Sequence, residues 1–78
     1  METKQVLAAL AALAQESRLA IFRLLIQAGP AGLPAGKIGE ELGIASSALS
    51  FHLKELVHAN LVTARQEGRF VIYTAQFD

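Results

Sequence analysis

The sequence predicts a mainly α-helical domain that ends in a small β-hairpin, and three observations support this fold class. Apolar residues recur at helical spacing through most of the first 59 positions. Glycine-containing breaks at Gly29-Pro30 and at Gly43 divide this region into separate helices. From Leu61 onward the chain is instead rich in Val, Thr, Ile, Tyr and Phe, which are typical of strands. At 78 residues the chain fits a single domain, residues 1–78.

The first helix is predicted over residues 4–14, with Thr3 as its N-cap. Its larger apolar residues form one stripe: Val6, Leu7, Leu10 and Leu13. The remaining positions are mostly alanine, which allows another helix to approach closely. We therefore expect this helix to form a symmetric homodimer, with apolar contact area from Val6, Leu10 and Leu13.

The second helix is predicted to begin near Glu16, because a carboxylate is favourable near a helix N-terminus. It should end at Gly29-Pro30, where glycine provides a left-handed cap and proline prevents continuation. The residues predicted to face inward are Leu19, Phe22, Leu25 and Ile26.

A helix-turn-helix is predicted over residues 35–59. After a loop that contains Gly32 and Pro34, a short helix runs over 35–42 and Gly43 closes it before a further helix begins. The hairpin follows over residues 61–76, with strands at 61–66 and 69–76 joined through Glu67-Gly68. The order α-α-α-α-β-β predicts a winged helix-turn-helix.

The last predicted helix has an unusual outer face. Opposite its leucines lie small hydroxyls, an aromatic ring and a lysine: Ser46, Ser47, Ser50, Phe51 and Lys54. The second helix of such a motif lies in the DNA major groove. Serines can bond to bases or phosphates, a ring can contact a thymine methyl, and a lysine can bind phosphate. The alternative is that the serines only cap a helix and that Phe51 fills a gap. The whole pattern favours DNA contact.

Further candidate contacts lie in the hairpin. Arg65, Gln66 and Arg69 flank its tip, and an arginine on such an arm can reach into a minor groove. An ordinary solvated hairpin is the alternative, and Glu67 within the tip favours it. Lys37, at the start of the third helix, is a candidate phosphate contact.

Composition limits the other function classes. The net charge is zero, which argues mildly against nucleic-acid binding, whereas 53% hydrophobic residues suggest a surface for self-association. A winged-helix protein-interaction module is therefore the alternative function. The chain has no cysteine, and His52 and His58 are six residues apart on different helix faces, so we expect no metal site and no cofactor. No nucleophile–base pair suggests an enzyme, and no apolar run or leader suggests a membrane or export, so we expect a cytoplasmic protein.

Three segments resemble the ArsR/SmtB-type metalloregulators. LAQESRLAIFRLL (13–25) is similar to the family's LADPTRLxILxLL, and GIASSALSFHLK (43–54) to its recognition helix GLSQSTVSHHLK. NLV (60–62) and EGRFVIY (67–73) are similar to its GLV and EGRWVxY wing segments. The resemblance implies a dimeric repressor that binds operator DNA and leaves it when an inducer binds, often a thiophilic metal or metalloid such as arsenite.

The sequence departs from the family pattern at three places. Where many arsenic-sensing members have CVCDL, both thiol positions are replaced, by Pro34 and Gly36. Ala45 stands at the usual serine cap of the recognition helix. The family usually continues into a C-terminal dimer helix, whereas this sequence ends at Asp78. We therefore expect that a metal or metalloid inducer acts only through residues not present in this chain.

Overall fold

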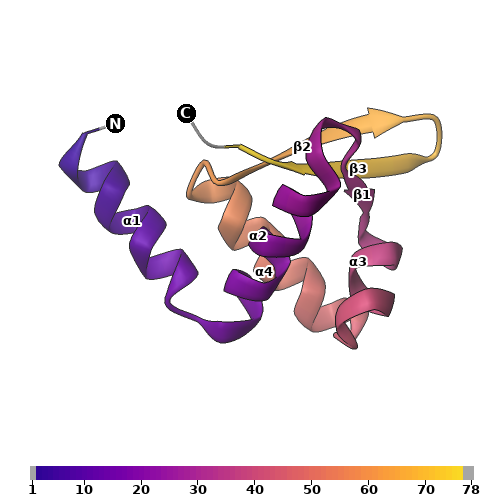
Figure 1. The fold of residues 1–78 in the computed structure, drawn as a ribbon, viewed down its shortest axis with the longest axis horizontal. Coiled ribbons are helices and arrows are strands. Elements are labelled where there is room, and N and C mark those ends of the chain that lie inside the picture. The colour runs from indigo at the N-terminus through magenta and orange to yellow at the C-terminus, as the bar shows by residue number, and fades with distance from the viewer. Residues whose placement is uncertain (1, 77–78) are drawn as a thin grey trace.

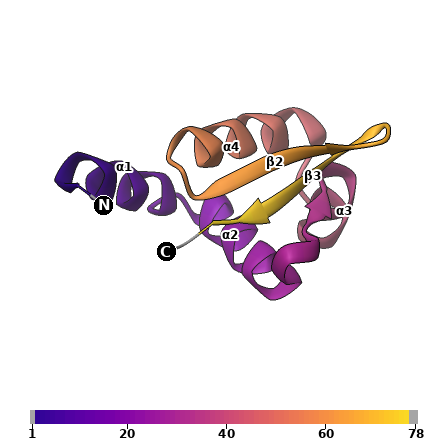
Figure 2. The same ribbon diagram turned by 90° about the horizontal axis from the view of Figure 1, so that it is seen from above.

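A computed structural model describes residues 2–76. Its elements, in order, are α1 (Thr3–Leu13), α2 (Glu16–Ala28), the 3₁₀ helix η1 (Gly29–Ala31), β1 (Leu33–Pro34), α3 (Ala35–Leu42), α4 (Ser46–His58), β2 (Val62–Glu67) and β3 (Phe70–Ala75). Figure 1 shows α2, α3 and α4 gathered together, with α1 to one side and the β2–β3 hairpin projecting to the other. In Figure 2, β2 lies beside α4 and β3 lies towards α2, in agreement with the packing of these elements.

The four α-helices lie within about one residue of their predicted bounds, but the first cap differs. Thr3 is the first helical residue, and the N-cap is Glu2. The Glu2 backbone N–H donates to the Gln5 side-chain oxygen at 3.1 Å, because a glutamine at the third helical position can reach back to the cap. Gly29 ends α2 as predicted, but its backbone (φ 69°, ψ −156°) lies outside the left-handed helical region that was predicted for it. Gly43 closes α3 in the left-handed conformation (φ 66°, ψ 36°).

The hydrophobic core lies where α2, α3 and α4 meet the base of the sheet. Its fully buried side chains are Ile21, Leu25, Ile38, Leu53, Leu56 and Val62. The predicted inner face of α2 was wrong at two positions, because Leu19 and Ile26 are 40% and 43% exposed. Apolar residues surround much of this helix, so periodicity alone does not select a face. The contacts of α2 with α3, α4 and β3 select Ile21 and Leu25.

Helix α1 packs through its alanines. Ala9 and Ala12 are buried in the core cluster, whereas Leu7 and Leu10 are 61% and 60% exposed. Leu13 is half-buried and packs against the core. The alanines therefore let α1 pack closely against the core, and the larger side chains Leu7 and Leu10 face solvent.

The sheet has one strand more than predicted. β1 pairs antiparallel with β3, which gives the order β1-β3-β2. A two-residue strand is too short to produce any alternation in the sequence. Gly32 precedes it with φ 66°, and a Cβ at this position would lie 2.5 Å from the Tyr73 carbonyl oxygen, so only glycine fits.

The hairpin turn lies one residue later than predicted. Glu67 pairs with Phe70, so Gly68 and Arg69 form the turn, and Gly68 has φ 62°. Every residue of β2 after Val62 is exposed, which means that the hairpin projects from the core. Within residues 2–76, none of the helices combines the length and apolarity needed to cross a membrane.

Candidate nucleic-acid interface

The approach of α3 to α4 fixes the direction of α4. Gly43 adopts the left-handed conformation between them, and the Ile44 backbone N–H donates to the Gly39 carbonyl at 3.0 Å. A Cβ on Gly39 would lie only 3.0 Å from the Ile44 carbonyl oxygen, so a small residue is needed at this crossing. Three buried leucines, Leu49, Leu53 and Leu56, then anchor α4 in the core.

The opposite face of α4 is exposed. Its side chains are those predicted as DNA contacts: Ser46, Ser47, Ser50, Phe51 and Lys54. The Phe51 residue is 56% exposed, so its ring is accessible to an external partner. Among residues 2–76, no side-chain hydrogen bond or ion pair involves the three serines or Lys54. Ala45, the N-cap, provides no side-chain cap bond, so this end of the helix is open to an external acceptor.

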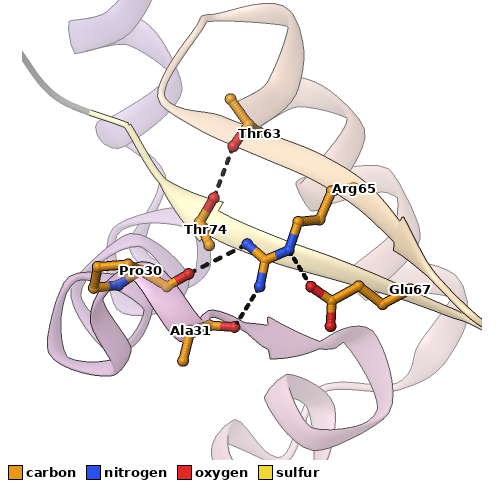
Figure 3. A network of polar contacts seen from close by, with 6 residues as sticks. All are labelled: Pro30, Ala31, Thr63, Arg65, Glu67 and Thr74. Carbon is orange, nitrogen blue, oxygen red and sulfur yellow. Dashed lines mark hydrogen bonds and ion pairs between the residues drawn. The ribbon is translucent and has the colours of Figure 1, made fainter.

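The structure places Arg65 differently from the prediction. Its two terminal nitrogens donate to the carbonyl oxygens of Pro30 (3.2 Å) and Ala31 (2.9 Å), and its Nε pairs with the Glu67 carboxylate (Figure 3). In this conformation β2 continues to Glu67 and brings Arg65 over the carbonyls of η1. The contact of Arg65 with a minor groove therefore stays a prediction. Arg65 therefore holds the hairpin to the turn after α2.

The other predicted hairpin and α3 residues are also located. The Gln66 side-chain amide donates to the Gly68 carbonyl at 3.0 Å, within the turn. Arg69 is exposed at the tip and forms no ion pair among residues 2–76. The Lys37 Nζ lies 3.7 Å from a carboxylate oxygen of Glu40 and 3.5 Å from one of Glu41, so two exposed carboxylates partly offset the lysine charge.

Sequence reasoning missed one residue beside this face. The Nε of Arg18, on α2, donates to Nδ1 of His52 at 3.2 Å, and its guanidinium carbon lies 5.4 Å from the centroid of the Phe51 ring. His52 accepts through Nδ1, so that nitrogen carries no proton in this arrangement. The partners are 34 positions apart in the chain, and no periodicity or spacing indicates such a contact.

The two histidines of α4 have separate surroundings. Among the described residues, no three His, Cys, Asp or Glu side chains lie close enough together to hold a metal ion. His52 is engaged with Arg18, and His58 lies exposed near the end of α4.

A glycine-closed pair of helices, an exposed face on the second helix and an antiparallel hairpin beside it define a winged helix-turn-helix module. Comparisons with known proteins then identify the family. The family described as "Helix-turn-helix domain" matches residues 13–65. HlyU from Vibrio cholerae is 34% identical with a TM-score of 0.85, and the match covers 99% of this chain and 83% of that one.

Two further solved structures agree. The winged helix-turn-helix domain of Mb0332 from Mycobacterium bovis, a homodimer and possible ArsR-family regulator, is 33% identical (TM-score 0.84; 92% of this chain, 64% of that one). An ArsR-like regulator from Rhodococcus sp. RHA1 is 29% identical (TM-score 0.82; 94% and 66%). No curated protein matches the sequence. The chain belongs to the ArsR family of winged helix-turn-helix transcription regulators, which are DNA-binding proteins rather than enzymes.

Proposed function

We propose that this protein is a sequence-specific transcriptional repressor that binds a two-fold symmetric operator as a homodimer in the cytoplasm. The observation that carries the proposal is the outer face of α4. Three hydroxyls, an exposed ring and a lysine point away from the core, and these side chains form no hydrogen bond or ion pair with the rest of residues 2–76. Solvation alone does not explain why the exposed Phe51 ring lies beside serines whose hydroxyls have no partner among these residues.

In the proposed complex, α4 lies in the major groove. Ser46, Ser47, Ser50 and Phe51 contact base edges, and Lys54 and Arg69 bind phosphates. The zero net charge is compatible with this arrangement, because charges act locally. Glu67 is paired with Arg65, and Glu40 and Glu41 lie beside Lys37, whereas Lys54 and Arg69 form no ion pair within residues 2–76.

The proposed homodimer uses the outward face of α1. Val6, Leu7 and Leu10 expose apolar surface there, and a small domain gains stability when such surface is covered. Leu7 was not among the predicted interface residues. Leu13, which was predicted there, is half-buried and packs against the core of its own chain. The homodimeric state of the similar Mb0332 domain supports the proposal.

We further propose that an inducer releases the repressor from its operator. A thiophilic metal or metalloid such as arsenite is the class that the family resemblance implies. Soft ions need thiolates, and the 78 residues contain no cysteine. Such an inducer therefore acts through residues outside these 78, and the 78-residue chain alone should bind neither arsenite nor zinc tightly.

The test is binding to DNA from the promoter of the protein's own operon. Footprinting should reveal a protected inverted repeat, and that duplex should bind more tightly than a scrambled duplex of the same composition. Specific sites typically bind about 10³–10⁷ times more tightly than non-specific DNA. Equal binding to both duplexes would contradict the proposal and would favour the protein-interaction module instead.

A further inference from the structure

Arg18 lies outside the helix-turn-helix, yet its side chain reaches the recognition helix. It is the third residue of α2, and it contacts the middle of α4 through two neighbouring side chains. Its Nε donates to Nδ1 of His52 at 3.2 Å, and its guanidinium carbon lies 5.4 Å from the Phe51 ring centroid. These contacts bring a positive charge to the edge of the face that carries Phe51 and Lys54.

The terminal nitrogens of this guanidinium are available to an external acceptor. Among residues 2–76 neither of them forms a hydrogen bond, and no carboxylate lies within ion-pair distance of Arg18. Glu55 borders the same shallow groove but makes no ion pair with it. The described residues also contain no buried side-chain nitrogen without a partner, so these amino groups reach solvent.

The two contacts also restrict the orientation of the group. One nitrogen is fixed by the imidazole, and the guanidinium lies near an aromatic ring, an arrangement favoured by cation–π attraction. A side chain that is already ordered loses less conformational entropy when it binds. A planar, permanently charged fork of N–H donors matches the geometry of a phosphate group.

From this geometry we infer that Arg18 binds a DNA phosphate next to the base pair that Phe51 contacts. The inference rests on the proposed function and extends the interface from the helix-turn-helix and wing to α2. His52 acts as a positioning residue, because its Nδ1 orients the guanidinium. With Lys54 and Arg69, Arg18 gives each subunit a third phosphate contact.

The same contacts are compatible with a purely structural role, in which Arg18 only joins α2 to α4. Charge separates the two roles. Arg18→Gln removes the charge but keeps a side-chain N–H that can donate to His52, whereas Arg18→Lys keeps the charge. Arg23→Gln is the matched control, because Arg23 is an exposed arginine on α2 whose side chain forms no hydrogen bond or ion pair among residues 2–76.

The measurement is the salt dependence of binding to the operator duplex, with thermal melting of each variant as a check on folding. Each lost phosphate contact reduces the slope of log K against log salt by about 0.9, so Arg18→Gln should flatten the slope by about 2 per dimer. Its operator affinity at low salt should fall by about tenfold or more. Arg18→Lys should retain most of the slope, and Arg23→Gln should match the parent.

Two results would overturn the inference: an unchanged slope for Arg18→Gln, or an equal change for Arg18→Gln and Arg23→Gln, which would reflect net charge only. If Arg18→Gln does not fold, chemical modification of the unmutated protein, with and without operator DNA, tests the contact. Phenylglyoxal should modify Arg18 less when operator DNA is bound and should modify Arg23 equally in both states; equal modification of Arg18 would reject the contact. A parent that shows no operator preference would instead refute the proposed function, and the inference with it.

Discussion

At the scale of single residues, the proposed complex gives the outer face of α4 two kinds of contact that respond differently to mutation. In that proposal the exposed Phe51 ring discriminates between bases, while Lys54 contributes charge. Phe51→Ala should lower operator affinity by about 1–3 kcal/mol, the usual cost of one lost base contact, with a nearly unchanged salt slope. Lys54→Ala should weaken operator and scrambled DNA alike and flatten the slope by about 2 per dimer.

Titrations of both variants against both duplexes, at several salt concentrations, separate these effects. Thymine placement sharpens the test, because the loss in Phe51→Ala should disappear when the contacted thymine is replaced by uracil, which lacks the methyl group. If Phe51→Ala binds both duplexes as the parent does, this face does not read bases.

The cap of the recognition helix is a second residue-scale feature. Ala45 has the extended backbone of an N-cap (φ −63°, ψ 146°) but no side-chain acceptor for the first free N–H groups. Ala45→Ser should therefore raise the free energy of unfolding by about 1 kcal/mol. Urea denaturation measures the change, and Ala45→Val, which adds a side chain without an acceptor and ranks with alanine as a poor N-cap, is the control. An equal gain in both variants would show that the cap bond is not the cause.

At the scale of elements, Arg65 links the hairpin to η1. It bonds two carbonyl oxygens and one carboxylate at an exposed site, where such contacts together are worth on the order of 1 kcal/mol. Arg65→Ala should therefore lower the stability by about that amount and leave the salt slope of DNA binding almost unchanged.

Arg69→Ala is the matched variant at the tip of the same hairpin, and we expect the reverse pattern for it. Its stability should be that of the parent, and its slope should flatten by about 2 per dimer. Denaturation and salt titration of both proteins form the test. A flatter slope for Arg65→Ala would mean that the guanidinium leaves η1 when DNA binds, as the sequence alone suggested.

The turn into β1 depends on one glycine. A Cβ at Gly32 would lie 2.5 Å from the Tyr73 carbonyl and 2.6 Å from the Thr74 methyl, at a φ of +66°. Gly32→Ala should cost about 3 kcal/mol or more, because both overlap and backbone strain oppose it. At Gly36, on α3, a Cβ would meet nothing within 4 Å, so Gly36→Ala should be neutral or stabilise by up to about 1 kcal/mol. Similar melting temperatures for the two variants would contradict this account.

The elements also show what the sequence can predict. Helix bounds were accurate because glycines and caps are local signals, and the exposed face of α4 followed from its leucine spacing. The inner face of α2, strand β1 and the contacts of Arg65 and Arg18 depend on segments distant in the chain. For each of these features the local sequence allows several arrangements, and the packing of distant segments determines which one forms. The residues that reach across elements were therefore the ones that sequence reasoning misplaced or missed.

At the scale of the whole molecule, its size and its exposed apolar surface point to association. A domain of 78 residues buries a limited share of its surface, yet α1 leaves its largest side chains in solvent. A two-fold axis near α1 would cover this face with an identical copy. A dimer that binds a two-fold operator must place its two α4 helices in successive major grooves on one side of the DNA, about 34–36 Å apart.

Leu10→Glu tests this assembly. Each Leu10 is 60% exposed in the single chain, and burial of a leucine contributes about 1.5–3 kcal/mol. Since a symmetric interface loses two such contacts and gains two buried charges, dimerisation should weaken by about 100-fold or more. Lys4→Gln is the control, because it changes the net charge equally on the same helix. Sedimentation equilibrium should show a dimer for the parent and for Lys4→Gln, and a monomer for Leu10→Glu.

The DNA-binding result of the same variants ties assembly to function. Leu10→Glu should lose its preference for the inverted repeat over a single half-site, because the gain from two linked contacts disappears when the subunits separate. Its binding to one half-site should stay close to that of the parent monomer, because the Leu10 side chain is exposed on α1 and is not among the proposed DNA contacts. A Leu10→Glu protein that remains dimeric would place the two-fold axis elsewhere. A parent that remains monomeric at high micromolar concentration would remove α1 as a dimer helix altogether.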